Sequence, residues 1–139
     1  MKIIDIPFNA LIGLKESASE ALLQLPNEAK YGNHLGTVHA AALFALAEAS
    51  AGELLLQTFK MPIDTIVPVV RSAELSYKRP AKGAIYSYGK LLDVEPEKVI
   101  ADLIEKNRVL FQVQIDLKDE EGILVFSSKF TWFVSRIVD

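Results

Sequence analysis

The sequence predicts a single α+β domain in which one long helix lies on an antiparallel sheet. The stretch from Thr37 to about Phe59 is dominated by alanine and leucine, the composition of a long helix. Segments rich in β-branched and aromatic residues follow, with polar residues interleaved as in half-buried strands. One helix followed by several long strands indicates a helix packed on one face of a sheet.

The size and composition fit one compact domain spanning residues 1–139. Half of the residues, 50%, are hydrophobic and 24% are charged, which excludes a disordered chain. The net charge of -3 argues against nucleic acid as a partner, because such proteins carry a basic surface. The chain has no cysteine, and the spacing of its two histidines, His34 and His39, matches no common metal motif, so no metal site is predicted.

No segment of the sequence predicts a membrane span or a secretion signal. Residues 1–7 lack a basic region followed by a long apolar run. The longest uninterrupted apolar block, residues 40–47, is far shorter than the ~20 residues that a bilayer requires. We therefore expect a soluble, cytoplasmic protein with no membrane partner.

The first part of the chain predicts short elements and then the long helix. Phe8–Leu14 and Ser17–Leu25 are expected to form a short strand or helix each, closed by a proline. Thr37 is the predicted N-cap of the long helix, since a threonine hydroxyl can accept a hydrogen bond from a free backbone N–H. The stop signal is the proline at position 62.

The second part of the chain predicts four strands and one short helix. Val67–Tyr77 and Ala84–Val94 are the first two strand candidates. Pro96–Lys106 is predicted to be a helix, with proline in its first turn and an apolar stripe. Val109–Leu117 and Ile123–Val134 are predicted to pair as a hairpin around a polar, glycine-containing turn.

Glu48 is the most unusual residue of the long helix. It stands two turns into a run of alanines, leucines and a phenylalanine. Acidic side chains are rarely buried without a partner, so a carboxylate in this setting needs an explanation. One possibility is a catalytic carboxylate whose pKa is raised by desolvation, and the other is an ion pair at the helix surface or at a dimer seam.

The polar loop before this helix resembles the signature of hotdog-fold acyl-CoA thioesterases of the phenylacetyl-CoA thioesterase type. The residues that carry the resemblance are Asn33, Gly36, Thr37 and His39, with Glu48 nine positions after the histidine. The segment Tyr77–Ala81 is similar to the strand-end motif of that family, and the closing hairpin also fits. The resemblance covers most of the chain from Pro7 onward and implies a hotdog fold, a long central helix wrapped by an antiparallel sheet.

The resemblance also implies a catalytic site. Glu48 would activate water or attack the thioester, and Asn33 would hold the thioester oxygen or position the water. The backbone N–H of Ala40 would be the oxyanion donor, because free N–H groups and the helix dipole meet at a helix start. Gly36 would shape the loop, and His39 would support it rather than act as the base. Such sites form across a homodimer or homotetramer interface.

Coenzyme A enters this prediction only as part of the substrate, and no separate cofactor is implied. Basic side chains near the end of the first long strand could meet its phosphates, by bidentate contacts from arginine and as point charges from lysine. A solvated basic strand end is the other interpretation. The residues concerned are Arg71, Lys78, Arg79 and Lys82.

Two other functions stay open. This chain has Ala40 and Ala41 where the thioesterase family usually has two glycines, which leaves open a hotdog protein that binds acyl-CoA or a fatty acid without turnover. A β-hydroxyacyl thioester dehydratase would use a loop histidine and a helix glutamate, and His34 precedes Glu48 by fourteen residues, a similar spacing. The flanking residues of that second family are absent.

Overall fold

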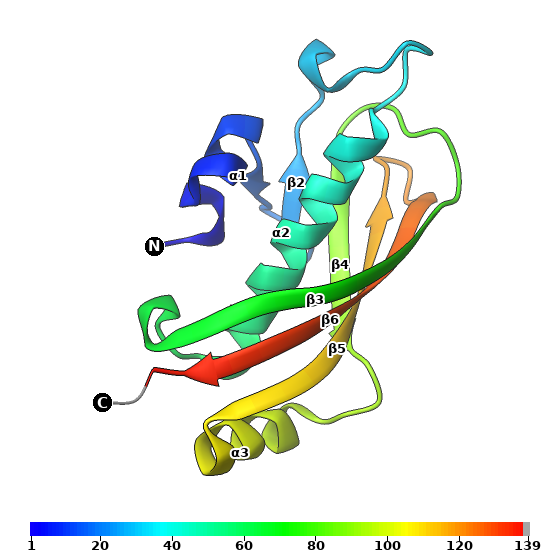
Figure 1. Ribbon diagram of the computed structural model, residues 1–139. Helices are drawn as coiled ribbons and strands as arrows, with labels where there is room; N and C mark the ends of the chain where they lie inside the picture. Colours follow the sequence, from blue (N-terminus) through cyan, green and yellow to red (C-terminus); the bar gives the residue numbers. More distant parts are fainter. Residues whose placement is uncertain (138–139) are drawn as a thin grey trace.

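The computed structural model describes residues 1–137 and shows a long helix wrapped by a curved antiparallel sheet (Figure 1). The six strands have the order β1-β2-β4-β5-β6-β3. The strands are β1 (Lys15–Glu16), β2 (Leu23–Leu25), β3 (Ile66–Tyr77), β4 (Ile85–Leu91), β5 (Arg108–Lys118) and β6 (Leu124–Arg136). The helices are α1 (Pro7–Ile12), α2 (Ala40–Phe59) and α3 (Pro96–Lys106), with 3-10 turns at Ile3–Asp5, Ala29–Tyr31 and Ile63–Thr65.

The predicted α+β layout is confirmed, and so are the long helix, the short helix over residues 96–106 and the closing hairpin. The predicted N-cap is wrong, because α2 begins at Ala40 with His39 as its cap. Thr37 is held in the loop instead. Its hydroxyl accepts from Asn33 Nδ2 at 2.8 Å, and its N–H donates to Asn33 Oδ1 at 3.0 Å.

Of the two segments expected to form a short strand or helix, Phe8–Leu14 lies mainly in helix α1 and Ser17–Leu25 is strand only at its end, and the strand expected over residues 84–94 is also shorter. Of residues 17–25, only the last three form a strand, because Ser19 turns the chain: its N–H donates to the Ser17 hydroxyl at 3.2 Å. The strand expected over residues 84–94 is β4, which ends at Leu91. Asp93 has a φ of 54°, a left-handed conformation that no strand continues through.

The core lies between α2 and the concave face of the sheet. Small residues of α2, such as Ala47 and Ala51, are fully buried and let the sheet approach closely. Opposite them, Phe126 and Phe130 of β6 are fully buried as well. By length and hydropathy α2 could cross a membrane, but 56% of that helical window is buried, as expected of the core helix of a domain.

A chain of buried hydroxyls joins α2 to the sheet. Ser50 donates to the carbonyl of Leu46 and lies 2.6 Å from the Ser87 hydroxyl on β4. Ser87 in turn accepts from the N–H of Leu23 on β2 at 3.0 Å. Both serines are completely buried, and these contacts satisfy their polar atoms inside an apolar core.

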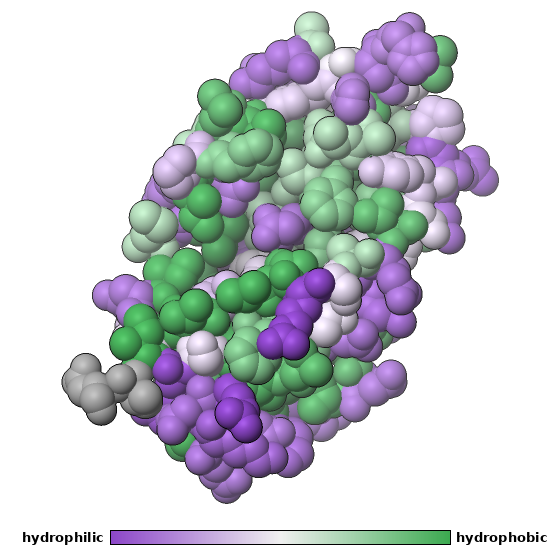
Figure 2. All heavy atoms as spheres, viewed as in Figure 1, coloured by the Kyte–Doolittle hydropathy of each residue, from purple (hydrophilic) through white to green (hydrophobic). Residues whose placement is uncertain are grey.

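Strand β3 is an open edge of the sheet. It is twelve residues long, and among residues 1–137 it pairs only with β6, so one side of its backbone has no strand partner in this part of the chain. Exposed apolar side chains lie on it and on α1, namely Val67, Val69, Phe8 and Leu11. In Figure 2, hydrophobic residues gather over α1 and β3, while hydrophilic residues concentrate at the top and bottom of the view. A long, apolar edge strand is a surface that can pair with another chain.

We predict that Gly89→Ala destabilises the fold by about 1 kcal/mol, the low end of the cost of overpacking, because Gly89 itself is exposed and the atoms that must move are terminal methyl groups. A Cβ at Gly89 would stand 2.6 Å from Ile115 and 3.1 Å from both Leu22 and Leu54. Urea unfolding measures the effect, with Lys90→Ala as the control because Lys90 is exposed on the same strand. Equal stability of Gly89→Ala and the wild type would contradict this account of helix–sheet contact.

Candidate active site

Glu48 lies on α2 and lines a cavity of about 230 Å³ whose walls are mostly apolar. The other lining residues come from the N-terminal turns, α2, β3 and β6: Ile3, Ile6, Asn9, Ala49, Gly52, Leu55, Leu56, Ile63, Pro68, Val70 and Trp132. Burial in these surroundings raises the pKa of the Glu48 carboxyl above its ordinary value. Within residues 1–137 Glu48 forms no ion pair, so the interpretation as a paired surface carboxylate is not supported inside one chain.

The cavity has no neighbouring cluster of metal ligands. Across residues 1–137, no three histidine, aspartate or glutamate side chains are grouped so that they could hold a metal ion.

The loop before α2 is organised by the side chain of Asn33. Its Oδ1 accepts from the N–H groups of Leu35 and Thr37, at 2.9 and 3.0 Å, and its Nδ2 donates to the Thr37 hydroxyl. Gly36 has a φ of 75°, which favours glycine. His34 is exposed on this loop. Among residues 1–137, the second amide hydrogen of Asn33 has no acceptor. Its predicted contact with the thioester oxygen stays a prediction.

His39 caps the start of α2. Its Nδ1 accepts from the N–H of Ala41 at 2.9 Å, while its carbonyl accepts from the N–H groups of Ala42 and Leu43. The N–H of Ala40 is left without an acceptor among the described residues. The first turn therefore offers one free backbone donor at the positive end of the helix dipole.

A second cavity, of about 310 Å³, brings together four of the predicted site residues. Asn33, Ala40, Lys78 and Arg79 all line it. Tyr77 ties the end of β3 to the helix start, since its hydroxyl donates to the Ala40 carbonyl at 3.3 Å. Ala40, whose N–H is free, and the cationic residues Lys78 and Arg79 therefore line the same cavity.

Arg71 is separate from this group. A β-bulge between Val70 and Ser72 interrupts the alternation of β3. The guanidinium of Arg71 stacks on the Phe133 ring, 4.5 Å from its centroid, and seven residues of strand, roughly 23 Å, separate it from Lys78. Within one chain, Arg71 does not join Lys78 and Arg79.

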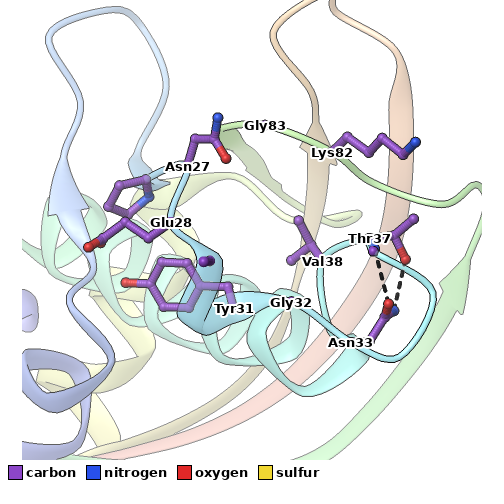
Figure 3. Close-up of a pocket in the computed structure, with 12 residues that line it drawn as sticks. Asn27, Glu28, Tyr31, Gly32, Asn33, Thr37, Val38, Lys82 and Gly83 are labelled. Carbon is purple, nitrogen blue, oxygen red and sulfur yellow. Dashed lines mark hydrogen bonds between the residues drawn. The ribbon is translucent and has the colours of Figure 1, made fainter.

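A third cavity is larger, about 570 Å³, but it does not include Glu48. Figure 3 shows it between the loop around Asn33 and the β3–β4 connection, with Lys82 lying above Val38 and Thr37. Its lining residues come from loops and a 3-10 turn and are a mixture of polar and apolar side chains. Among these three cavities, only the one of about 230 Å³ is lined by Glu48, the carboxyl group whose pKa is raised by burial.

The carboxylate and the free N–H are too far apart to act on one atom within a chain. Glu48 follows Ala40 by eight residues on one straight helix, a rise of roughly 12 Å. They also line different cavities. Within one chain, the Glu48 carboxyl group and the Ala40 N–H therefore do not share a cavity.

Sequence reasoning did not assign two polar residues to the Glu48 cavity. Asn9 of α1 is 5% exposed and donates from Nδ2 to the carbonyl of Ile3 at 2.9 Å. Trp132 of β6 is 5% exposed and lines the same cavity. Asn9 could have been noticed in the sequence, because it is a polar residue inside the apolar segment Phe8–Leu14. No sequence pattern places Trp132 in this cavity.

The chain belongs to the family described as a domain of unknown function, DUF4442, whose model matches residues 13–134. Among solved structures, it is 27% identical to a Pseudomonas aeruginosa protein of unknown function called a probable thioesterase, with a TM-score of 0.79 over 97% of this chain and 91% of that one. This likeness confirms the predicted hotdog fold. Comparison with curated protein sequences finds no match.

Two more distant structures share the fold. A thioesterase from Haemophilus influenzae is 18% identical, with a TM-score of 0.74 over 99% of this chain and 88% of that chain. A Bacillus halodurans protein, solved with CoA, is 16% identical, with a TM-score of 0.69 over 91% of this chain and 74% of that chain. The structural neighbours are thus hotdog proteins of the thioesterase superfamily.

We predict that Glu48→Gln stabilises the protein at neutral pH and that this gain disappears in acid. The folded state raises the pKa of Glu48, so it holds the proton more tightly than the unfolded chain does. Stability of the wild type should fall as the pH rises from the ordinary carboxyl range through the raised pKa. Unfolding curves of both proteins against pH measure the difference, and a gap that widens toward acid would contradict the assignment.

Proposed function

We propose that this protein is an acyl-CoA thioesterase that hydrolyses an acyl-coenzyme A thioester to the free acid and CoA. The observation that carries the proposal is the half-buried Glu48 carboxyl, which has a raised pKa in an apolar cavity and forms no ion pair with any residue of the described range 1–137. A carboxyl group in this environment is suited to general-base or nucleophilic chemistry. The thioesterase names and the bound CoA of structural neighbours support the choice of reaction.

The proposed reaction begins at the thioester carbonyl. Glu48 takes a proton from water as the water oxygen attacks the carbonyl carbon, or attacks that carbon itself. The free N–H of Ala40 and the remaining amide hydrogen of Asn33 stabilise the negative oxygen. When water attacks, the C–S bond then breaks, the CoA sulfur takes the proton that Glu48 had accepted, and the free acid leaves. When Glu48 itself attacks, breakage of the C–S bond leaves an acyl anhydride on Glu48; water then hydrolyses this anhydride, which releases the free acid, restores Glu48 and supplies the proton for the CoA sulfur.

The proposed site is built from two chains. The separation of Glu48 and Ala40 along α2 supports this, since the carboxylate of one subunit would meet the helix start of the other. The open edge of β3 and the exposed apolar side chains beside it offer a surface for a second copy. A homodimer, or a homotetramer of such dimers, would complete two sites at once.

Lys78 and Arg79 are the proposed contacts for the CoA phosphates. They line the same cavity as the Ala40 helix start, where the thioester would lie. Lysine and arginine both bind phosphate groups well. Arg71 would reach CoA only if the partner's strand brought it close. Gly36 and His39 support the proposed site through loop shape and the helix cap.

A second candidate is a protein that binds acyl-CoA without hydrolysing it. The methyl group of Ala40, beside the proposed oxyanion donor, is the observation that favours it, because that side chain is exposed where the thioester would approach. Calorimetric binding of acyl-CoA together with undetectable hydrolysis would support this function over the first.

We predict that Glu48→Gln lowers acyl-CoA hydrolysis by about 10²–10⁴-fold, the range of a lost general base. Release of free CoA thiol from a panel of acyl-CoAs measures the rate. Glu53→Gln is the matched control, since Glu53 lies on the same helix, bonds to Gln57 at 3.2 Å and does not line the cavity. Unchanged hydrolysis in Glu48→Gln would overturn the role of Glu48.

We predict that Ala40→Pro removes the oxyanion donor and lowers kcat by about 10²–10³-fold without breaking α2. Proline lacks the N–H and is favoured at the first helical position, which Ala40 occupies, and His39 already has the extended conformation that proline requires before it. Ala40→Gly, which keeps the N–H, is the control.

Mixing the Ala40→Pro and Glu48→Gln proteins tests whether the site spans two chains. Mixed dimers would contain one intact site, so random reassociation should restore about a quarter of the wild-type activity. A site confined to one chain would give no recovery.

A further inference from the structure

The cavity beside Glu48 follows one flank of α2, away from the start of the helix. Its lining residues Glu48, Gly52, Leu55 and Leu56 have the spacing that places side chains on one face of a helix. The rise along the axis from Glu48 to Leu56 is roughly 12 Å. Ile63, in the 3-10 turn after the helix, also lines the cavity. We call this elongated space the α2 groove.

The α2 groove is not sealed inside the core. Half of its lining residues are half-buried, so part of their surface is accessible: Ile6, Glu48, Leu56, Ile63, Pro68 and Val70. One wall comes from the N-terminal turns, which approach α2 at Gly52. A Cβ there would stand 3.2 Å from Cδ1 of Ile3. Glycine weakens a helix interior relative to alanine, and here it brings this wall close to the helix.

Beyond Glu48, the walls of the α2 groove are apolar surface. Among residues 1–137, the other lining side chains with polar atoms are those of Asn9 and Trp132. Asn9 is buried, and its Nδ2 donates to the carbonyl of Ile3 at 2.9 Å. Nε1 of Trp132 has no partner in this range, but it is too deeply buried for a ligand to reach. A chain in the groove would therefore gain from apolar contact and not from hydrogen bonds.

We infer that the acyl chain of the substrate lies in the α2 groove of the subunit that supplies Glu48, extended from the carboxyl group toward Leu56 and Ile63. The inference rests on the proposed thioesterase function and names the substrate class of the same site, acyl-CoAs with an unsubstituted chain of medium length. Each methylene gains by burial against these walls, whereas a polar substituent loses its hydration without gaining a partner. Leu56 and Ile63 are the specificity-determining residues, because they line the far end of the groove.

The volume of the α2 groove limits the length of the chain. The groove measures about 230 Å³, whereas an apolar cavity of about 150 Å³ in another protein binds benzene. Benzene has the carbon count of a hexanoyl group, so the groove holds a somewhat longer chain. The acyl groups that fit lie between hexanoyl and decanoyl.

The first experiment is a chain-length scan with the even-numbered saturated acyl-CoAs from acetyl to palmitoyl. We expect kcat/KM to rise by about fourfold for each added methylene, the value that apolar burial gives, up to an optimum between hexanoyl and decanoyl. Beyond this optimum it should fall, because the chain no longer fits. Equal kcat/KM at all lengths, or a rise that continues to palmitoyl, would overturn the inference.

The apolar character of the groove is tested with a matched pair of substrates. Adipoyl-CoA has the length of hexanoyl-CoA but ends in a carboxylate. We expect its kcat/KM to be lower at least about tenfold, because that charge would lose its hydration in an apolar site. Similar values for the two substrates would contradict the proposed environment of the chain.

Variants at the far end of the groove should move the optimum in opposite directions. Leu56→Ala and Ile63→Ala make room there and should favour the next longer chain, whereas Leu56→Phe should favour the next shorter one. Leu54→Ala is the matched control, since Leu54 is a half-buried leucine of the same helix that does not line the groove. An optimum that stays at the wild-type length in Leu56→Ala and Ile63→Ala would overturn the inference.

Mixed dimers identify the subunit that holds the chain. When Ala40→Pro and Glu48→Gln proteins reassociate, the intact site takes its glutamate from the Ala40→Pro chain. Leu56→Ala should therefore shift the optimum when it is added to the Ala40→Pro chain and not when it is added to the Glu48→Gln chain. The reverse result would place the acyl chain in the other subunit and overturn the assignment.

Calorimetric titration with the free fatty acids gives a readout that needs no turnover. The affinity should reach its maximum at the same length as kcat/KM and shift in the same way in Leu56→Ala. If no acyl-CoA is hydrolysed but this length dependence is present, the proposed function fails and the acyl site stands. Hydrolysis without a shift of the optimum in the variants would refute only the inference.

Discussion

The close contact between α2 and the sheet is the constraint on which the rest of this structure depends. A core helix of small residues and a strand with glycine at position 89 bring the two layers together, and the Ser50–Ser87 hydroxyl bridge fixes their relative position. Glu48 lies outside this contact and is half-buried at the flank of the helix, where residues of α1, β3 and β6 line a cavity.

Burial on that flank determines the chemistry of Glu48. A carboxyl group in water holds its proton weakly and is a poor base, whereas desolvation raises its pKa and strengthens it as a base. The stabilising core and the destabilising carboxyl group lie on the same helix. The fold can carry the cost of one half-buried carboxylate because the surrounding contacts on α2 are numerous and apolar.

The sequence predicted the features that depend on composition and period, and it missed those that depend on single contacts. The long helix and the hairpin could be predicted because, in each segment, many residues favour the same secondary structure. The first residue of the long helix could not be predicted in this way, because Thr37 and His39 could each act as the N-cap. In the structure, Asn33 hydrogen-bonds Thr37 and holds it in the loop, so His39 is the cap. The outward direction of Arg71 depends on a bulge, which side-chain alternation alone does not reveal. The unpaired Trp132 N–H depends on the packing of three elements.

The arrangement of the two cavities links the fold to the proposed assembly. A straight helix cannot bring its first turn and its third turn to one reacting atom, so no loop movement within a chain would join Glu48 to the Ala40 N–H. A second helix placed alongside by pairing of the β3 edges would supply the missing half. An unpaired edge strand is usually a risk for aggregation. In the proposed dimer, the same unpaired β3 edge would be the surface through which two copies pair and complete the site.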